Sequence, residues 1–314
     1  MITTYMDDCL LLGQGFLSRD YSSLREKVLS DKKNMTGCVE NAGEIYGYTI
    51  SKNVPVSSLY MRDVFTVKFA LSRVNKLHSD SQAMSLSLLC FQLKQYIMEH
   101  PAYYIIRLPL HIMDLVRAFN EIQDGMYFCG GTTEQIAISD PPEVARMDGV
   151  EVFIARPSYI TQHSDDLRRI IAESFYEYSS QYHVNPATED KACDVYTNWI
   201  SAELESPKQN SIAVAAYNNR PIGLSLYHEN EIGIEGLLVA VDQRWRGLHA
   251  QQAIYALLSR KARAQQKVFV SSTQLDNFIS AGNMNAIGMR PFYGIYNYHI
   301  DSHIIQSVTN AARS

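Results

Sequence analysis

The sequence predicts an α/β protein in which helices pack on a mixed β-sheet. Three observations lead to this fold class. Of the 314 residues, 46% are hydrophobic and 19% are charged, so apolar material suffices for packed cores. The first half alternates strand-like and helix-like stretches, and the second half joins an antiparallel meander to a strand–helix–strand crossover. The length fits two domains of ordinary size.

A Pro-Pro pair marks the predicted boundary between the two domains. Pro141 and Pro142 follow a strand-like run and disfavour continued regular structure. We therefore expect domains at 1–142 and 143–314, with a softer boundary near 31–43. No repeat of fixed period is visible in the sequence.

Apolar spacing predicts elements in β, α, β, α, β order for the first half. They follow helical stretches over 6–29, where Gly13 and Gly15 favour a turn or kink over a dinucleotide-binding loop. The expected elements are one or two strands at 58–71, a helix at 79–99, a strand at 102–108, a helix at 112–122 and a strand at 126–138. A turn is expected at Gly130-Gly131 within the last strand.

The second half is predicted in β, α, α, β, β, β, α, β, α, β order. The expected elements are a strand at 150–155, helices at 164–182 and 189–204, strands at 211–217, 221–228 and 232–241, a helix at 247–265, a strand at 267–273, a helix at 278–287 and a strand at 292–300. Asn218-Asn219 supplies the turn of a hairpin. Ser164 and the two aspartates after it supply an N-cap and an acidic first turn.

Composition excludes several classes of function. A formal net charge of -5 and a pI near 6.0 argue against general attraction to nucleic acid or anionic membranes. The five cysteines form no CxxC pair, so neither a disulfide framework nor a metal site is expected. No apolar run approaches the roughly 20 residues that span a bilayer. These features predict a soluble protein in the reducing cytoplasm, without membrane insertion.

One segment of the second half has the chemistry of an anion site. The strand that ends at Val241 is followed by a basic turn with Arg244 and Arg246, and a helix is expected to begin at Gly247. The first amides of a helix have no intrahelical partner, and the helix dipole makes that end positive. Glycine lets a diphosphate approach the backbone closely. Without further context, the same residues describe a basic surface turn that leads into a helix.

That turn resembles the coenzyme A diphosphate motif of the GNAT superfamily of N-acyltransferases, Arg/Gln-x-x-Gly-x-Gly/Ala. Arg244-Trp245-Arg246-Gly247-Leu248-His249 is similar in its first four elements, and His249 replaces the last small residue. The hairpin at 220–227 resembles the family's Gly-x-Pro-x-Gly strand. Asn277 and Gly288 have the spacing of its closing segment, with Met289 in place of phenylalanine. The resemblance implies a GNAT fold at 143–314, preceded by a smaller, partial GNAT-like α/β domain.

The resemblance also implies a set of residues that bind acyl-CoA. Main-chain groups of Leu238, Val239 and Val241 would pair with the pantetheine arm as an added strand does. Asn277 would contact that arm from the other side. The implied diphosphate site consists of Arg244, Trp245, Arg246, Gly247, Leu248 and His249.

Candidate catalytic groups follow from the chemistry of acyl transfer to an amine. Glu235 is the candidate base because it lies four residues before Val239 on one strand, so that the two side chains would share a face. A solvent-facing carboxylate is the alternative for Glu235, and Glu231 is the alternative base. The Val239 amide would polarise the thioester carbonyl.

The general acid is less clearly predicted by the sequence. Many GNAT enzymes have a tyrosine seven residues after the Asn, where this chain has Met284. Either the thiolate leaves unaided, or His249 or Tyr293 protonates it.

Three stretches of the first half, 107–110, 114–116 and 128–132, resemble bacterial nucleotide-sugar N-acyltransferases. That resemblance implies acyl transfer from acyl-CoA, without a metal, to a dTDP-linked amino-dideoxy sugar, as in lipopolysaccharide or capsule biosynthesis. Acetyl is the default acyl group, and Met284 in place of a tyrosine would leave room for a short hydroxyacyl chain such as 3-hydroxybutanoyl. The first domain would shape the acceptor pocket or act as a scaffold, and Arg107 is a candidate for binding a diphosphate. A homodimer is one option for assembly. Two alternatives stay open: an acetyltransferase for an amino acid, polyamine or protein amine, and a catalytically silent CoA-binding regulatory protein.

Overall fold

The computed structural model describes residues 35–41, 44–71, 80–110, 112–121, 126–137, 139–144, 148–176, 178, 181–185, 187–205, 211–229 and 233–302. The helical stretches expected over 6–29 lie outside these residues, and so do the turn or kink expected at Gly13 and Gly15 and the alternative base Glu231. None of the described helices is long and apolar enough to cross a membrane.

The first half follows the predicted alternation, with additional elements at its start. It consists of β1 (Gly37–Asn41), β2 (Glu44–Lys52), α3 (Val54–Tyr60), β3 (Val64–Leu71), α4 (Asp80–Glu99), β4 (Tyr103–Pro109), α5 (Met113–Asn120) and β5 (Met126–Ala137). The strand expected from residue 58 is partly wrong, because Asn53 caps a helix there by accepting a hydrogen bond from the Val56 amide. The turn expected at Gly130-Gly131 is also wrong: β5 runs through it, with Gly130 at φ +86°.

The second half has the predicted order of strands and helices, with α6 and α8 as additional short helices. It consists of β6 (Val150–Ile154), α6 (Pro157–Gln162), α7 (Ser164–Tyr176), α8 (Gln181–Val184), η2 (Glu189–Lys191), α9 (Asp194–Glu205), β7 (Ile212–Tyr217), β8 (Arg220–Glu229), β9 (Gly233–Val241), η3 (Gln243–Trp245), α10 (Ala250–Ala264), β10 (Val268–Gln274), α11 (Phe278–Ala286) and β11 (Met289–Asp301). Asn218 and Asn219 both have positive φ, as the hairpin turn between β7 and β8 requires. The helix expected at 164–182 ends earlier, at Tyr176.

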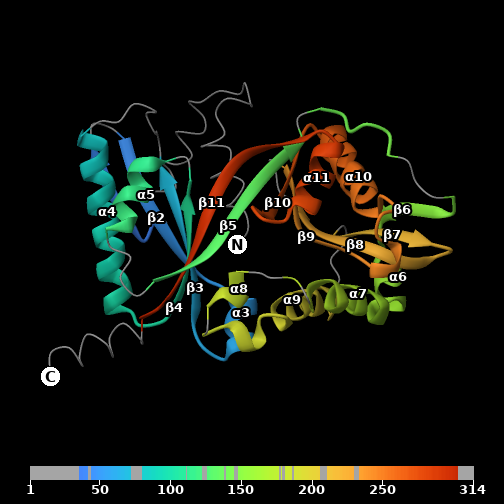
Figure 1. Cartoon of the computed structure of the whole chain (residues 1–314), viewed down its shortest axis with the longest axis horizontal. Coiled ribbons are helices and arrows are strands. Elements are labelled where there is room, and N and C mark those ends of the chain that lie inside the picture. The colour runs from blue at the N-terminus through green and yellow to red at the C-terminus, as the bar shows by residue number, and fades with distance from the viewer. Residues whose placement is uncertain are drawn as a thin grey trace.

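All described strands form one sheet, in the order β1-β2-β3-β4-β11-β5-β10-β9-β8-β7-β6. Apart from α3 between β2 and β3 and η3 between β9 and α10, the elements β2, β3, α4, β4, α5 and β5 follow the same order as β8, β9, α10, β10, α11 and β11. In each half, the first and second of these strands pair in antiparallel fashion, and the second and third strands pair in parallel. The last strands are exchanged, since β11 lies between β4 and β5, and β5 pairs with β10. Figure 1 shows β5 and β11 as the long strands that join the two halves.

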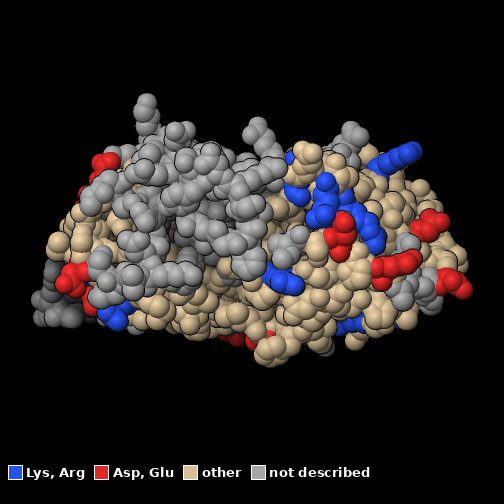
Figure 2. Space-filling model, turned by 90° about the horizontal axis from the view of Figure 1, so that it is seen from above, with Lys and Arg blue, Asp and Glu red and all other residues tan. Residues whose placement is uncertain are grey.

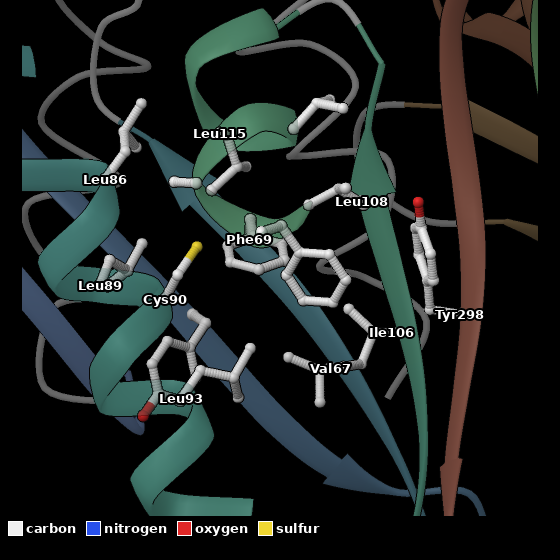
Figure 3. Packing of buried hydrophobic residues seen from close by; sticks show 14 of the residues in the cluster. Val67, Phe69, Leu86, Leu89, Cys90, Leu93, Ile106, Leu108, Leu115 and Tyr298 are labelled. Carbon is white, nitrogen blue, oxygen red and sulfur yellow. The ribbon is translucent and has the colours of Figure 1, made fainter. Parts of the chain in front are cut away.

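The three largest apolar clusters of the described residues cover much of this sheet. One lies between α4, α5 and the first half of the sheet, and it includes Tyr298 of β11 together with Ile106 of β4 and Phe69 of β3 (Figure 3). A second lies under α10, and a third lies between α7, α9 and the opposite face. The carboxy-terminal strand therefore completes the core of the first half.

Candidate functional site

Strands β9 and β10 diverge at the centre of the second half. Their parallel pairing runs from Gly233 opposite Val268 to Gly236 opposite Ser271 and stops there, although β9 continues to Val241. The β8–β9 register shifts at the same place, so that Leu237 is the extra residue of a β-bulge. The bulge turns β9 away from β10, and the two strands form a V.

Side chains hold the base of this V. The hydroxyl of Ser271 donates to the Gly236 carbonyl at 3.0 Å and lies 3.1 Å from the Tyr255 hydroxyl. A Cβ atom at Gly236 would lie 2.9 Å from that serine oxygen. Glycine at 236 therefore lets the two strands approach before they separate.

A cavity of about 1380 Å³ opens from the V and is lined by both halves of the chain. It exceeds the roughly 300–1,000 Å³ of a typical small-molecule pocket. Its apolar and aromatic wall includes Phe175, Tyr196, Trp199 and Leu238. The volume is suited to two substrates that meet at the V.

The turn after β9 presents backbone amides to this cavity. Gly247 has φ +80° and His249 has φ +59°, both left-handed. The helix expected from residue 247 therefore begins three residues later, at Ala250. His249 makes no capping side-chain hydrogen bond, and its Nδ1 lies 3.1 Å from Oε1 of Gln252. The first turn of α10 lines the cavity, so its unpaired amides are available to an anion.

We expect Gly247→Ala to lower the free energy of unfolding by about 1–2 kcal/mol. No atom lies within 4 Å of the added Cβ, so the cost is that of a left-handed backbone for an L-residue. Gly282→Ala is the matched control, because Gly282 lies inside α11 and also has open space around it. The control should gain about 0.5–1 kcal/mol. Equal stability of the two variants in chemical denaturation would contradict this account.

The two arginines of the turn have different surroundings. Arg244 lies outside the cavity lining and donates to both carboxylate oxygens of buried Asp242, which also binds Arg169. Arg246 lines the cavity together with Trp245. Of the six residues predicted to bind a diphosphate, Arg244 and Leu248 are therefore the two outside the cavity lining.

We expect Asp242→Asn to destabilise the protein by about 2 kcal/mol at pH 7, because the three charge-assisted hydrogen bonds from Arg244 and Arg169 are weakened. The side chain of Arg244 is 72% exposed, and solvent screening keeps the effect modest. The hydrogen bonds from Arg244 and Arg169 hold the pKa of Asp242 well below its usual range. Its stabilisation is therefore present above about pH 4 and is lost as the pH falls further.

The pH dependence can be checked by urea denaturation between pH 3 and 7, where the gap between wild type and Asp242→Asn should narrow toward the acid end. Asp165→Asn is the control, since the Asp165 side chain is fully exposed and its pair with Arg168 spans 3.7 Å. A control as destabilised as Asp242→Asn would refute the assignment.

Glu235 lies at the base of the V, inside the cavity lining. Its side chain is only 8% exposed, so the alternative of a solvent-facing carboxylate is wrong. Burial, reinforced by the negative charge of Glu134, raises the pKa of Glu235 to about 8, while Lys68 and Arg107 oppose that shift. One oxygen of Glu235 is buried without a hydrogen-bond partner among the described residues. The group is thus poised to exchange a proton near neutral pH.

The prediction that the side chains of Glu235 and Val239 share a face of β9 is wrong. The bulge at Leu237 changes the alternation of β9, so that Glu235 and Leu238 lie opposite His228 and Leu226 on one face. Val239 is opposite Ser225 and packs against the cluster under α10, whereas Leu238 belongs to the cluster under α7 and α9. Val239 lines the cavity, and its main-chain groups remain the candidate contact for a substrate at the V.

Asn277 lies at the cavity and caps α11, because its side-chain oxygen accepts from the Ser280 amide at 3.0 Å. It also shares a hydrogen bond with the hydroxyl of Tyr178, a cavity residue in the segment after α7. Burial raises the pKa of Tyr178, and the Asn277 hydrogen bond opposes that shift. Sequence reasoning missed Tyr178, because it belongs to no motif.

The positions considered for a general acid differ in their surroundings. Met284 is fully buried in the core under α10 and lies outside the cavity lining. His249 is exposed at the cavity. The backbone of Tyr293 is part of β11, and its side chain lies outside the described residues. Tyr178, which is partly buried, is therefore the hydroxyl that lies beside Asn277.

Comparison with known proteins bears on the fold. No protein-family model matches the chain, and no curated relative matches it. A GCN5-related N-acetyltransferase from Sphaerobacter thermophilus is similar, with a TM-score of 0.57, 11% identity, and coverage of 96% of this chain and 91% of that chain. A GCN5-related N-acetyltransferase from Kribbella flavida (TM-score 0.52, 8% identity, coverage 90% and 96%) and a GNAT-family acetyltransferase from Colwellia psychrerythraea (0.50, 8%, 90% and 97%) are also similar.

These likenesses extend over both halves, and identities of 8–11% establish architecture alone. The bulged V between β9 and β10 and the repeated order of elements agree with that architecture. The protein therefore has the GNAT fold in its carboxy-terminal half, preceded by a smaller, partial unit of the same kind.

Proposed function

We propose that this protein is an acyl-CoA-dependent N-acyltransferase. The observation that carries the proposal is the opening of β9 from β10 directly beside the uncapped first turn of α10, within one cavity. The free edge of β9 suits a pantetheine arm, which pairs with main-chain groups of Leu238, Val239 and Val241. The amides at the start of α10, with Arg246, suit a diphosphate.

In the proposed reaction, the acceptor amine attacks the thioester carbonyl of acyl-CoA. The C–N bond forms, the amine proton passes to the carboxylate of Glu235, and the main-chain amide of Val239 stabilises the oxyanion. The C–S bond then breaks. A thiolate is a good leaving group and can depart before it is protonated. It then takes a proton from Tyr178 or from water. The raised pKa of Glu235 favours turnover over a silent CoA-binding protein, since it matches the base to neutral pH.

For the acceptor, we propose an amino-dideoxy sugar carried on dTDP, with acetyl or 3-hydroxybutanoyl as the acyl group. Trp199 and Tyr196 line the cavity and suit stacking on a nucleobase. A polyamine or basic peptide would favour an acidic groove. On the face seen in Figure 2, the described acidic side chains are instead scattered, some beside Lys and Arg and others alone at the edges of the view.

Free-thiol release tests both levels of this proposal. Acetyl-CoA and 3-hydroxybutanoyl-CoA are each offered with dTDP-linked amino sugars, spermidine and a basic peptide. Release with an amino sugar alone supports the full proposal, and release with spermidine or peptide alone discards the sugar. No release and no acyl-CoA binding by calorimetry would overturn the enzyme assignment, whereas binding without release would leave a CoA-binding protein.

A further inference from the structure

A polar row crosses the sheet from the first half into the cavity. Lys68 of β3 lies opposite Arg107 of β4, and Arg107 lies opposite Asn297 of β11. The Asn297 amide donates to the hydroxyl of Thr132 on β5 at 3.0 Å. All four residues line the cavity, while their chain neighbours Val67, Ile106 and Tyr298 point into the core under α4 and α5. Residues opposite each other on paired strands share a face, so these side chains form one row.

This row lies where the parallel pairing of β3 with β4, in the first half of the chain, ends. The β3–β4 ladder stops at Lys68 opposite Arg107, as the β9–β10 ladder stops at Gly236 opposite Ser271. In the second half, the last paired residues are the small residues Gly236 and Ser271. In the first half, the last paired residues are the cations Lys68 and Arg107. The first half has therefore kept the geometry of the repeat while it carries a different chemistry at the same position.

The charged residues that the first half places in the cavity lining are cationic, although the buried carboxylate of Glu134 on β5 also acts on Glu235. Among the described residues that the first half contributes to the cavity, the charged ones are Lys52, Lys68 and Arg107, all cationic. Lys52 is half exposed and forms an ion pair with Asp63 at 2.5 Å. Lys68 and Arg107 act electrostatically on Glu235, the proposed base, so the row and the base belong to one site. Neighbouring Lys and Arg side chains in a cavity wall suit a carboxylate or a phosphate.

We propose that Lys68, Arg107 and Asn297 form an anion subsite that holds a carboxylate or phosphate of the acceptor while its amine lies at Glu235. The inference rests on the proposed acyltransferase function and deepens it, because it names the acceptor class as amines that carry their own anionic group. The first half thereby supplies acceptor recognition, and the second half supplies acyl-CoA binding and the base.

Matched amine pairs test the subsite. Glycine is compared with glycinamide, and phosphoethanolamine with ethanolamine, by thiol release and, separately, by calorimetric titration without acyl-CoA. The anionic member of at least one pair should be preferred by about tenfold or more. The preferred pair identifies carboxylate or phosphate as the anion. In Lys68→Met and Arg107→Met, KM and Kd for that anionic amine should rise about 10- to 100-fold, with acyl-CoA affinity unchanged.

Lys52→Met is the control, because it removes a half-exposed cation from the same wall but outside the row. Should Arg107→Met fail to fold, Arg107→Lys keeps the charge and should retain part of the preference. The anion subsite would be refuted if both members of each pair were used and bound equally, or if the variants affected both members alike. Neither result would contradict the proposed acyltransferase function. If no acyl-CoA binds, the proposed function fails, and the titrations still decide whether Lys68 and Arg107 bind an anion.

Discussion

Replacing Glu235 with glutamine is expected to lower kcat by about 100- to 10,000-fold, the usual contribution of a general base. Glutamine keeps the shape of the side chain and removes its ability to take a proton from the amine. Acyl-CoA affinity should not change, because the proposed contacts with the cofactor arm are those of the β9 backbone beyond the bulge. Single-turnover thiol release and equilibrium titration of acyl-CoA separate the two effects.

The pH profile makes the test specific to proton transfer. Only the ionised carboxylate accepts a proton, so the wild-type rate should rise with pH up to the pKa of about 8 at Glu235. Glu235→Gln should lack that rise. Glu173→Gln is the matched control, since Glu173 also lines the cavity but is half exposed and paired with Arg169 at 2.9 Å. Wild-type kcat in Glu235→Gln, or an equal loss in the control, would remove Glu235 from the mechanism.

The raised pKa of Glu235 also has a consequence for stability. A buried carboxyl whose folded-state pKa exceeds its unfolded value binds more protons in the folded state. Its stabilising contribution is complete below about pH 4 and is lost as the pH rises to about 8. Glu235→Gln has no such titration, so its stability relative to wild type should increase over this range.

Local sequence patterns predicted the helices and strands near the V well. They failed where an extra residue determines which face a side chain is on, or where distant strands pair. Hydrophobic alternation placed β7, β8 and β9 and the helix after them. It did not reveal the bulge at Leu237, because a bulge changes the phase of a strand without a marker in composition. The predicted shared face of Glu235 and Val239 was wrong for that reason. The left-handed backbone of His249 was likewise not predictable from its residue type, because glycine usually occupies that conformation.

The contribution of the first half was the least predictable part of the site. Arg107 was a candidate for binding a diphosphate, and it lines the cavity, but its neighbours Lys68 and Asn297 come from strands distant in sequence. Their meeting depends on the insertion of β11 between β4 and β5, and no local period encodes which strands pair. The structural repeat of the two halves is also hidden, because it lies in the order of elements and not in residue identities. The domain boundary at 142/143 stays a prediction.

The exchange of strands leads to the second large expected effect: residues 143–302 alone should not fold cooperatively. In the whole chain β11 lies between β4 and β5, and β10 pairs with β5, so removal of the first half deprives β11 of both partners and exposes an edge of β10. It also uncovers Tyr298 and Ile300, which are buried in the core of the first half. Each large apolar side chain contributes about 1.5–3 kcal/mol, against a net stability of about 5–15 kcal/mol for a whole domain.

A nicked full-length chain is the control that separates strand exchange from mere chain length. A protease site inserted between Val144 and Asp148 cuts the covalent link but leaves the β4–β11, β5–β11 and β5–β10 ladders intact. The two fragments should stay together on gel filtration and unfold in one transition, because hydrogen bonds and apolar contacts across the exchanged strands hold them. The 143–302 fragment by itself should aggregate or show no cooperative transition in calorimetry. Cooperative unfolding of that fragment, or separation of the nicked halves under native conditions, would show that each half folds independently of the exchanged strands.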